Sequence, residues 1–440
     1  MKHLRLLWER IMKERLAIVD GIRSPFCKAG SEMANIAPDD LGAVIVKELL
    51  AKTDIDVNLI DELIMGNVGQ PSNACNIARV IALKAGLPED LIAYTVHRNC
   101  ASGMQSITTG YEKLLAGAGE IVIAGGTESM SQYPLKFGSK MTSLFNDLMK
   151  AKSTAQKLSL LAQFRPTYLK PVISIIEGLT DPICGLNMGQ TAEVLAREFS
   201  ISREEQDNYA LHSHLKAASA QQHGFFESEI HPILLPPHYH KAQLTDNSIR
   251  ADQSIEKLAK LKPFFDRTAG SITVANACPI TDGAGAVLIM LESKAKALGY
   301  QPLGYLRDYA YAGLGPDRMG LGPVYATSKL LAKSAMKMTD FDLIELNEAF
   351  AAQVIANQCA FSSAKFAQSH LNKHQALGEI NADTLNIHGG AIALGHPVGA
   401  TGTRLVITML KALRAQNKNC GLVTLCIGGG QGASLALEVE

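Results

Sequence analysis

The stretch His97-Arg-Asn-Cys100-Ala-Ser-Gly-Met-Gln105 lies where an extended run turns into a helix. Apolar residues then recur at helical spacing, namely at Met104, Ile107, Tyr111, Leu114 and Leu115. This spacing predicts a helix over 101–118, and the apolar run at 120–126 predicts a buried strand after it. Strands that alternate with helices in this way indicate an α/β architecture.

The same alternation occurs on both sides of this stretch. Before it, the patterns predict strands at 15–20 and 63–66 and a helix at 41–52. In the last third they predict, in order, a strand, two helices and two strands at 344–346, 348–360, 404–415, 421–426 and 433–438. Whether the two ends of the chain are duplicates stays open, because the sequence symmetry between them is weak.

The middle of the chain, 131–270, is richer in polar residues, proline and histidine than the two ends. This composition predicts an inserted, mostly helical cap. Two helices are expected within 190–222, where Ser202 and Glu205 have the spacing of a capping box.

Within the middle, residues 136–171 form a basic segment with Asp147 as its one acid. Its seven basic residues are Lys136, Lys140, Lys150, Lys152, Lys157, Arg165 and Lys170. Its apolar residues on one helical face are Met141, Leu144, Phe145, Leu148 and Met149. A basic amphipathic helix can lie on an anionic membrane or on a partner. The alternative is a solvated helix that packs one face on the cap.

Composition excludes several classes of protein. The chain has 440 residues, of which 47% are apolar, so it can build more than one buried core. Lys plus Arg and Asp plus Glu both number 42, and this balance argues against nucleic-acid binding. The eight cysteines are scattered without a CxxC pair, which favours a reduced, intracellular protein over a zinc ribbon or redox dithiol.

The N-terminal stretch 1–12 is basic and has helical character, but it lacks the apolar core of a secretory signal. Glu9, Glu14 and the absence of serine argue against a mitochondrial presequence, and Met12 is an alternative start. No apolar run along the chain reaches the ~18–20 residues that span a bilayer.

Cys100 is a candidate nucleophile. A thiol at a helix N-terminus lies near free backbone N–H groups and the positive end of the helix dipole, which favour the thiolate. The small residues 101–103 leave room for a substrate carbonyl. The alternative is a buried structural cysteine.

A second segment, 386–402, holds five glycines together with His388 and His396. Glycines permit positive φ and close backbone approach, but the spacing fits neither a Walker A loop nor a GxGxxG fingerprint. His396 is followed by Pro397, and a histidine in such a turn can act with a cysteine from elsewhere. His388 is interpreted as a turn histidine.

A third segment, Cys426-Ile-Gly-Gly-Gly430-Gln-Gly432, ends a predicted buried strand in glycines. This arrangement presents a thiol and several N–H groups to a cavity, as a base beside an oxyanion hole requires. The alternative is a tight hairpin in which the cysteine is incidental.

Together these three segments resemble the active-site blocks of the thiolase family. Asn347-Glu-Ala-Phe350 resembles a fourth block, and Asn276 with Thr281-Asp-Gly-Ala284 resembles a further one. The resemblance extends from about Glu14 to the end of the chain. It implies the thiolase fold, with two duplicated βαβαβαββ halves in a five-layer α-β-α-β-α sandwich and an inserted, mainly helical loop domain.

The resemblance also implies domain boundaries. The N-terminal half, with the nucleophilic cysteine, comprises 13–130 and 271–293. The loop or cap domain comprises 131–270, with the basic insert at 136–171. The C-terminal half, with the histidine and the second cysteine, comprises 294–440.

The family's catalytic roles map onto five residues. Cys100 is implied to be the acylated nucleophile, His396 the base that activates it, and Cys426 the second acid/base. Asn347 is implied to hold a water that forms one oxyanion hole with His396, and the N–H groups of Cys100 and Gly428 to form the other.

Coenzyme A is implied as a co-substrate, with no metal and no permanently bound cofactor. The positions implied to contact it are Met188, Asn276, Cys278 and Gly395. Cys278 replaces a serine that is common in the family, and a thiol is a weaker hydrogen-bond donor than a hydroxyl.

The implied activity is CoA-dependent cleavage of 3-ketoacyl-CoA in fatty-acid β-oxidation. The insert and the stretch 321–327 resemble the β subunit of fatty-acid oxidation complexes. The alternatives are a biosynthetic acetoacetyl-CoA thiolase, a decarboxylating ketoacyl synthase, and a non-catalytic lipid-carrier or scaffold homologue. Cys426 stands where the synthase would use a second histidine, and it counts against that alternative.

The resemblance implies acyl-CoA and CoA as substrates and a homodimer or dimer of dimers. It further suggests a hydratase/dehydrogenase α subunit as partner and a peripheral membrane contact through 136–171, and no nucleic acid. The expected location is the bacterial cytoplasm, at the membrane periphery where the insert binds lipid, or the mitochondrial matrix in a eukaryote.

Overall fold

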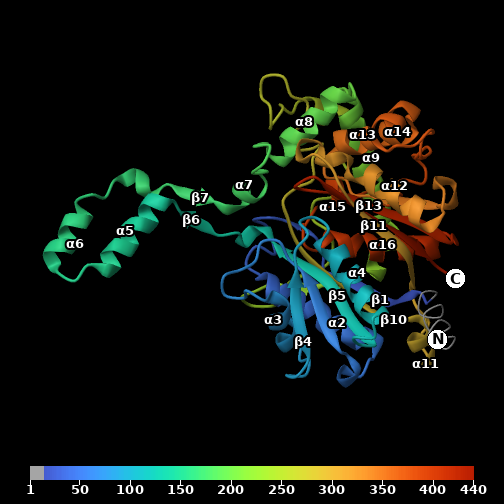
Figure 1. Ribbon diagram of the computed structural model, residues 1–440, viewed down its shortest axis with the longest axis horizontal. Coiled ribbons are helices and arrows are strands. Elements are labelled where there is room, and N and C mark those ends of the chain that lie inside the picture. The colour runs from blue at the N-terminus through green and yellow to red at the C-terminus, as the bar shows by residue number, and fades with distance from the viewer. Residues whose placement is uncertain (1–13) are drawn as a thin grey trace.

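The computed structural model describes residues 14–440. The helical character expected for 1–12 therefore lies outside the described residues. The strands form one hydrogen-bonded sheet in the order β12-β13-β14-β11-β1-β10-β5-β3-β4. Its two halves lie on opposite sides of a middle pair of helices, and further helices cover the outside (Figure 1). Within 14–440, no helix has the length and apolarity needed to cross a membrane.

The first half of the sheet comes from the N-terminal part of the chain. Its elements in chain order are β1 (Leu16–Arg23), α2 (Pro38–Thr53), β3 (Glu62–Gly66), α3 (Ile77–Lys84), β4 (Ile92–Val96), α4 (Ser102–Leu115), β5 (Ile121–Ser129) and β10 (Thr281–Leu291). They follow the expected βαβαβαββ order. β3 pairs in parallel with β4 and β5, whereas β10 is antiparallel to both β5 and β1.

The second half repeats this order with one difference. Its elements are β11 (Gly304–Gly313), α12 (Gly322–Ser334), β12 (Leu343–Leu346), α13 (Ala351–Ser362), α16 (Thr401–Ala415), β13 (Cys420–Ile427) and β14 (Gln431–Glu438). The strand expected between α13 and α16 is reduced to a single parallel bridge between Ile344 and Leu385. It ends there because the next residue, Asn386, has a left-handed φ of 44° and begins the glycine-rich turn. The two halves join where β1 pairs with β11.

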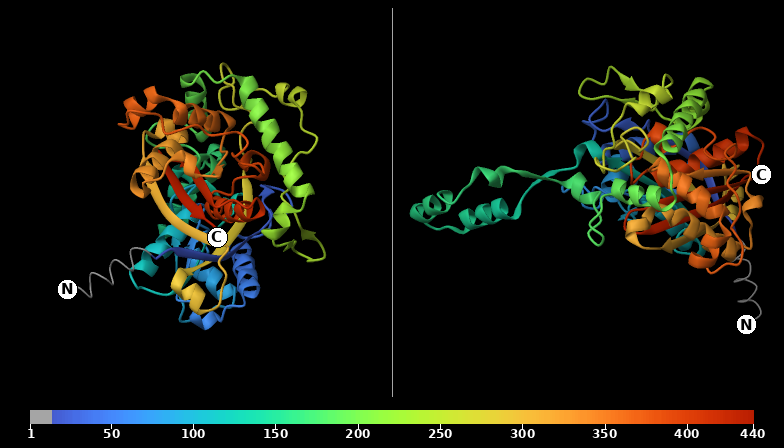
Figure 2. Two further views of the ribbon diagram at one scale, coloured as in Figure 1. Left: turned by 90° about the vertical axis from the view of Figure 1, so that its right-hand side faces the viewer. Right: turned by 90° about the horizontal axis from the view of Figure 1, so that it is seen from above.

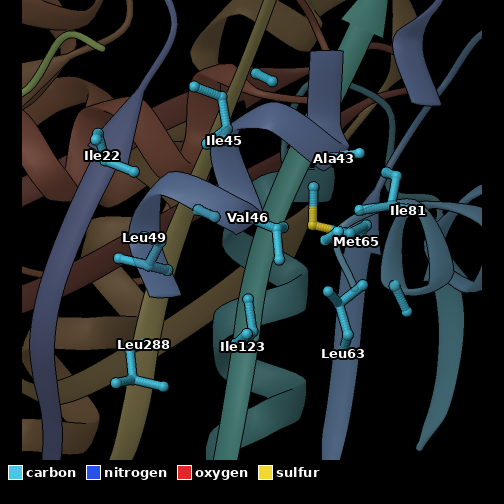
Figure 3. Close-up of a cluster of buried hydrophobic side chains, with 14 of the residues drawn as sticks. Ile22, Ala43, Ile45, Val46, Leu49, Leu63, Met65, Ile81, Ile123 and Leu288 are labelled. Carbon is cyan, nitrogen blue, oxygen red and sulfur yellow. The ribbon is translucent and has the colours of Figure 1, made fainter. Parts of the chain in front are cut away.

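The helices form the outer and middle layers of the sandwich. β3 is buried on both faces, as strands of an internal parallel sheet are. Leu63 and Met65 belong to the buried cluster that also contains Val46 of α2 and Ile81 of α3 (Figure 3), whereas Ile64 faces the middle layer. The middle layer consists of α4 and α16, whose apolar residues share one cluster with both halves of the sheet. With α12 and α13 on the other outside face, the layers run α-β-α-β-α.

The middle of the chain contains α7 (Ser174–Gly178), α8 (Met188–Glu198) and α9 (Arg203–Gln222). α9 begins with the expected capping box, because Ser202 accepts from the Glu205 N–H and the Glu205 side chain returns to the Ser202 N–H. The shorter elements of the described chain are β2 (Cys27–Lys28), β8 (Ile233–Leu234), β9 (Ala242–Gln243), α10 (Ile255–Ala259), α11 (Glu292–Ala297), α14 (Ala364–His370) and α15 (Ala391–Leu394).

Residues 135–173 form an arm that extends away from the rest of the molecule (Figures 1 and 2). Its base is a two-stranded ribbon of β6 (Leu135–Phe137) and β7 (Pro171–Ile173), and its tip holds α5 (Ser139–Lys150) and α6 (Thr154–Leu161). Met141 and Leu144 are buried in α5, which contacts α6, β6 and the turn at 166–169. The interpretation of α5 as a helix packed on the cap is therefore wrong. The arm itself covers Met141 and Leu144, whereas Phe145 and Met149 of the same face are exposed.

Candidate active site

Cys100 lies directly before α4, as the sequence indicated. The chain turns into the helix at Asn99, which has a left-handed φ of 43°. The Ser102 hydroxyl accepts from the Arg98 N–H at 2.9 Å and donates to the Asn99 carbonyl at 2.7 Å, which stabilises this turn. The backbone N–H groups of Cys100 and Gly428 lie close enough to the half-buried Cys100 thiol to favour its thiolate. Burial raises the pKa of the Cys100 thiol, and these two N–H groups oppose the rise.

Gly428 belongs to the tight turn between β13 and β14, whose next two residues, Gly429 and Gly430, have φ of 90° and 81°. The Asn99 side-chain amide donates to the Gly428 carbonyl at 2.6 Å. The turn is thereby tied to the segment that carries Cys100. A Cβ at Gly428 would lie 3.2 Å from the Met188 sulfur, so the start of α8 covers the turn.

Cys426 lies near the end of β13 and is 1% exposed. Burial raises the pKa of its thiol well above the usual value, and the nearby Cys100 and Cys278 thiols add to the rise. Cys278 is held by a backbone hydrogen bond to Ala349 at 3.0 Å. The structure therefore brings three thiols together from the two halves of the sheet.

His396 is buried, and its ring orientation follows from its neighbours. Its Nδ1 lies 2.6 Å from the Thr401 hydroxyl, and that hydroxyl donates to the Pro397 carbonyl at 3.0 Å. The Thr401 hydroxyl has one proton, and it donates this proton to the Pro397 carbonyl, so it can only accept from His396. His396 therefore carries its own proton on Nδ1, and its free lone pair is on Nε2. Within residues 14–440, Nε2 has no hydrogen-bond partner. Burial lowers the pKa of His396 to about 3, with Arg404 adding to the effect, so the ring is neutral at physiological pH.

Two glycines bring the His396 turn against the start of α4. A Cβ at Gly103 would lie 2.6 Å from the Thr403 hydroxyl, and one at Gly402 would lie 2.5 Å from the Met104 backbone nitrogen. Only residues without a side chain permit this approach. The N-termini of α4 and α16 therefore meet, and Cys100 and His396 are carried on the two segments that lead into them.

Asn347 follows β12 and is 1% exposed. Its N–H donates to the Thr424 carbonyl at 3.0 Å, and Phe350 forms a bridge to Ala277, so α13 begins after this segment rather than within it. Neither side-chain atom of the Asn347 amide has a partner in the described part of the chain. Buried amides in proteins are almost always hydrogen-bonded, so this one has a place for a water or ligand.

The positions implied for coenzyme A fall into two groups. Met188 lies beside Gly428, Cys278 lies beside the other two thiols, and Gly395, with φ of 105°, packs on Thr281 next to His396. Asn276 is different, because its amide donates to Asp207 at 3.0 Å and accepts from the Thr273 N–H at 2.7 Å. Its side chain stabilises the loop from inside the protein.

His388 is not grouped with the thiols. Its ring stacks on Phe225 with centroids 3.6 Å apart, and burial lowers its pKa to about 4. This arrangement agrees with the interpretation of His388 as a turn histidine.

Sequence reasoning missed three residues that support the site, Thr401, Glu128 and Glu348. Glu348 accepts from the Ser213 hydroxyl at 2.6 Å and the Asn386 amide at 2.9 Å, and so fixes the start of the glycine-rich turn. Thr401 follows His396 by five residues in the same glycine-rich segment, and this short separation is the signal that could have identified it. Glu128 accepts from the Gly399 N–H at 2.9 Å in the turn that follows His396.

Both halves of the chain are similar to known proteins of one family. Residues 16–293 match the thiolase N-terminal domain and residues 300–439 match the thiolase C-terminal domain. The chain is 43% identical over 428 residues to a 3-ketoacyl-CoA thiolase of Yersinia pestis (strain Pestoides F), covering 97% of each chain.

Solved structures give the same result. The acetyl-CoA acetyltransferase of Bacillus anthracis superposes with a TM-score of 0.84 at 33% identity, covering 97% of this chain and 98% of that one. Human mitochondrial 3-ketoacyl-CoA thiolase, solved in complex with CoA, superposes with a TM-score of 0.82 at 32% identity and the same coverage. The chain belongs to the thiolase family of acyltransferases.

Proposed function

We propose that this chain is a 3-ketoacyl-CoA thiolase, which uses CoA to cleave 3-ketoacyl-CoA into acetyl-CoA and a shortened acyl-CoA. The observation that carries the proposal is the environment of Cys100. Two backbone N–H groups lie near its sulfur and favour the thiolate, and a second buried thiol, Cys426, lies beside it. The names of the similar proteins support the same substrate class.

In the first half-reaction, Nε2 of His396 accepts the proton of Cys100, and the thiolate attacks the 3-keto carbon. The bond between the α and β carbons then breaks, and its electron pair leaves as the enolate of acetyl-CoA. Cys426 donates its proton to the α carbon and becomes a thiolate. The products are acetyl-CoA and an acyl group bound to Cys100 as a thioester.

In the second half-reaction, the Cys426 thiolate takes the proton of an incoming CoA thiol. The CoA sulfur attacks the acyl thioester, and the bond to Cys100 breaks. The Cys100 thiolate then recovers its proton from His396. Each group ends in the protonation state in which it began, so the cycle needs no oxidant or reductant.

Two sets of donors stabilise the charges that develop. The N–H groups of Cys100 and Gly428 face the oxygen of the group bound to Cys100, and one such donor is typically worth ~3–4 kcal/mol. Asn347, whose buried amide lacks a partner among the described residues, holds a water that stabilises the enolate oxygen together with His396.

The test is CoA-dependent thiolysis of a long-chain and a short-chain 3-ketoacyl-CoA by the purified protein. Strong activity on the long substrate is the expected result. Activity on acetoacetyl-CoA alone would favour the biosynthetic acetoacetyl-CoA thiolase, which the likeness to the Bacillus enzyme keeps as the second candidate. Absence of activity on both would contradict the proposal.

The edge strand β4 supports a homodimer. It ends the sheet, and its first residue, Ile92, is 60% exposed. An exposed edge with apolar side chains is a surface on which another strand can pair. Ile92→Lys is expected to lower the mass measured by analytical ultracentrifugation, whereas Leu59→Lys, at another exposed apolar position, should leave it unchanged.

The arm is proposed as a docking element for an α subunit or an anionic membrane. Its exposed apolar residues include Leu135, Phe137, Met149, Leu158, Leu161 and Leu169. They accompany the basic residues of 136–171, a combination that suits both surfaces. Replacing 136–170 by a short glycine-serine linker should reduce pelleting with anionic vesicles, or pull-down of an α subunit, more than acetoacetyl-CoA turnover. Unchanged values in both assays would contradict this role and, with it, a location at the membrane periphery of the cytoplasm.

A further inference from the structure

Glu128, near the end of β5, is fully buried and has no part in the mechanism above. Its carboxylate accepts hydrogen bonds from several segments of the chain. The donors are the N–H groups of Val68 at 3.0 Å, Gly69 at 2.8 Å and Gly399 at 2.9 Å, the Tyr133 hydroxyl at 3.1 Å and the Asn67 amide at 3.3 Å. Each of these groups donates, which is the arrangement that suits an ionised carboxylate.

Gly399 connects this carboxylate to the catalytic base. It lies in the turn between His396 and Thr401, and the backbone of that turn closes on Pro397 through the Thr401 N–H at 2.9 Å. A Cβ at Gly399 would lie 2.7 Å from Glu128 Oε2 and 2.7 Å from the Thr127 carbonyl. The turn therefore packs closely against the end of β5, and the hydrogen bond to Glu128 holds it there.

Glu128 also lies close enough to Cys100 to affect its charge. Burial is the main cause that raises the pKa of the Cys100 thiol, and the Glu128 carboxylate adds to the rise. Burial also raises the pKa of Glu128 itself to about 7. The titratable side chains that interact with Glu128 are Tyr133, at the foot of the arm, and Cys100. A buried negative charge at this place opposes a resting thiolate, in the same direction as the burial of the thiol.

We propose that Glu128 is a positioning residue for the thiolase reaction, whose carboxylate attaches the turn that carries His396 to β5 and places a negative charge beside Cys100. This inference rests on the proposed function. Glu128 would thus help to position His396, and its charge would favour the protonated form of Cys100 before the reaction.

The test is the pair Glu128→Gln and Glu128→Asp. Glutamine keeps the shape but removes the charge and turns an NH2 group toward backbone donors. We expect kcat to fall about a hundredfold, which is the scale of a misplaced catalytic group, with KM little changed. The pH midpoint for alkylation of Cys100 by iodoacetamide should move to lower pH. Aspartate keeps the charge but does not reach Gly399, so kcat should fall while the alkylation midpoint stays.

Tyr133→Phe is the mild variant that answers the question if the others do not fold. It removes one donor from the carboxylate, which raises the pKa of Glu128. Because the carboxylate attaches the turn when ionised, kcat of the wild type should decline as pH falls through about 7, and this limb should move to higher pH in Tyr133→Phe. An unmoved limb would overturn the proposal.

Two further results would overturn it. One is a Glu128→Gln enzyme with the wild-type alkylation midpoint and wild-type kcat. The other is a loss of kcat that only follows a loss of folded protein, seen by circular dichroism, with an unmoved midpoint. The alkylation assay needs no turnover, so it tests Glu128 even if the protein cleaves no 3-ketoacyl-CoA, and failure of the proposed function is distinguished in this way.

Discussion

The two halves of the fold contain equivalent helices, α4 in the N-terminal half and α16 in the C-terminal half. The halves differ in the segment that precedes this helix. Before α4 stands a regular strand, β4, with a short connection to Cys100. Before α16 stands a single bridge at Leu385 and then the long turn that holds His396. The duplicated scaffold thus supplies two helix N-termini that meet, and the segments before them supply a nucleophile and a base.

This comparison shows where each half is constrained. In the N-terminal half, backbone pairing brings Cys100 to its place, because β4 follows β3 in register from Glu62 to Gly66. In the C-terminal half, side chains replace that pairing. Thr401, Glu348 and Asn386 each hold part of the turn that carries His396.

The largest expected effect on turnover comes from Cys100, the nucleophile that only the N-terminal half carries. Cys100→Ala should abolish turnover, because no acyl-enzyme can form. Thiolysis is followed by the loss of 3-ketoacyl-CoA in the presence of CoA. The exposed Cys75 provides a matched control, since Cys75→Ala should keep wild-type activity. Measurable turnover by Cys100→Ala would assign the nucleophile to another residue.

The second variant separates the roles of the two thiols. Cys426→Ala should lose turnover by about 10²–10⁴-fold, the range for removing a general acid/base. It should still form labelled protein from radiolabelled acetyl-CoA, because His396 and Cys100 remain. Cys420→Ala, at the other end of β13, is the control with both functions intact. Absence of label in Cys426→Ala would contradict the division of labour between Cys100 and Cys426.

Much of the N-terminal half could be predicted from sequence, because its signals are local. The apolar spacing after Cys100 predicts α4, and the runs at 63–66 and 120–126 predict β3 and β5. The cysteine also lies at the helix start, as expected. A periodic pattern of apolar residues indicates which residues are buried. This is sufficient to predict strands and helices that are regular.

The rest could not be predicted, because it depends on contacts between distant segments. Nothing near Glu128 in the sequence shows that it accepts from both 68–69 and 399. The amphipathic pattern of α5 indicates a buried face but not that α6 covers it, so the projection of the arm was missed. The division into the domains stated above stays a prediction.

The hydroxyl of Thr401 fixes the orientation of the His396 ring. Thr401→Val removes the hydroxyl that accepts from Nδ1 of His396, so the ring can rotate or exchange its tautomer. We expect kcat to fall by about tenfold to a hundredfold, with KM little changed, as for other losses of a group that orients a catalytic histidine. Thr401→Ser keeps the hydroxyl and should restore most of the activity. Equal activity of the valine and serine variants would exclude this role.

The smallest effect on chemistry, and the sharpest test of the comparison, is expected at Asn386. Its side-chain amide accepts from the Leu346 N–H at 2.9 Å and donates to the Leu346 carbonyl at 2.9 Å. These are the bonds that a neighbouring strand would make, and in the other half β4 makes them to β3. Asn386→Ala should therefore lower the free energy of unfolding by about 2–4 kcal/mol, because buried backbone groups lose their partners.

Asn417 isolates the contribution of the amide. Both asparagines have a left-handed backbone, with φ of 44° at Asn386 and 51° at Asn417, but Asn417 is exposed. Alanine is strained equally at both positions, so the difference between the two variants in urea unfolding measures the side-chain bonds alone. If Asn386→Ala and Asn417→Ala lower the free energy of unfolding equally, the Asn386 side chain does not stabilise the turn, and the flanking backbone is sufficient. The two halves would then be supported in the same way, and the missing strand would need no substitute.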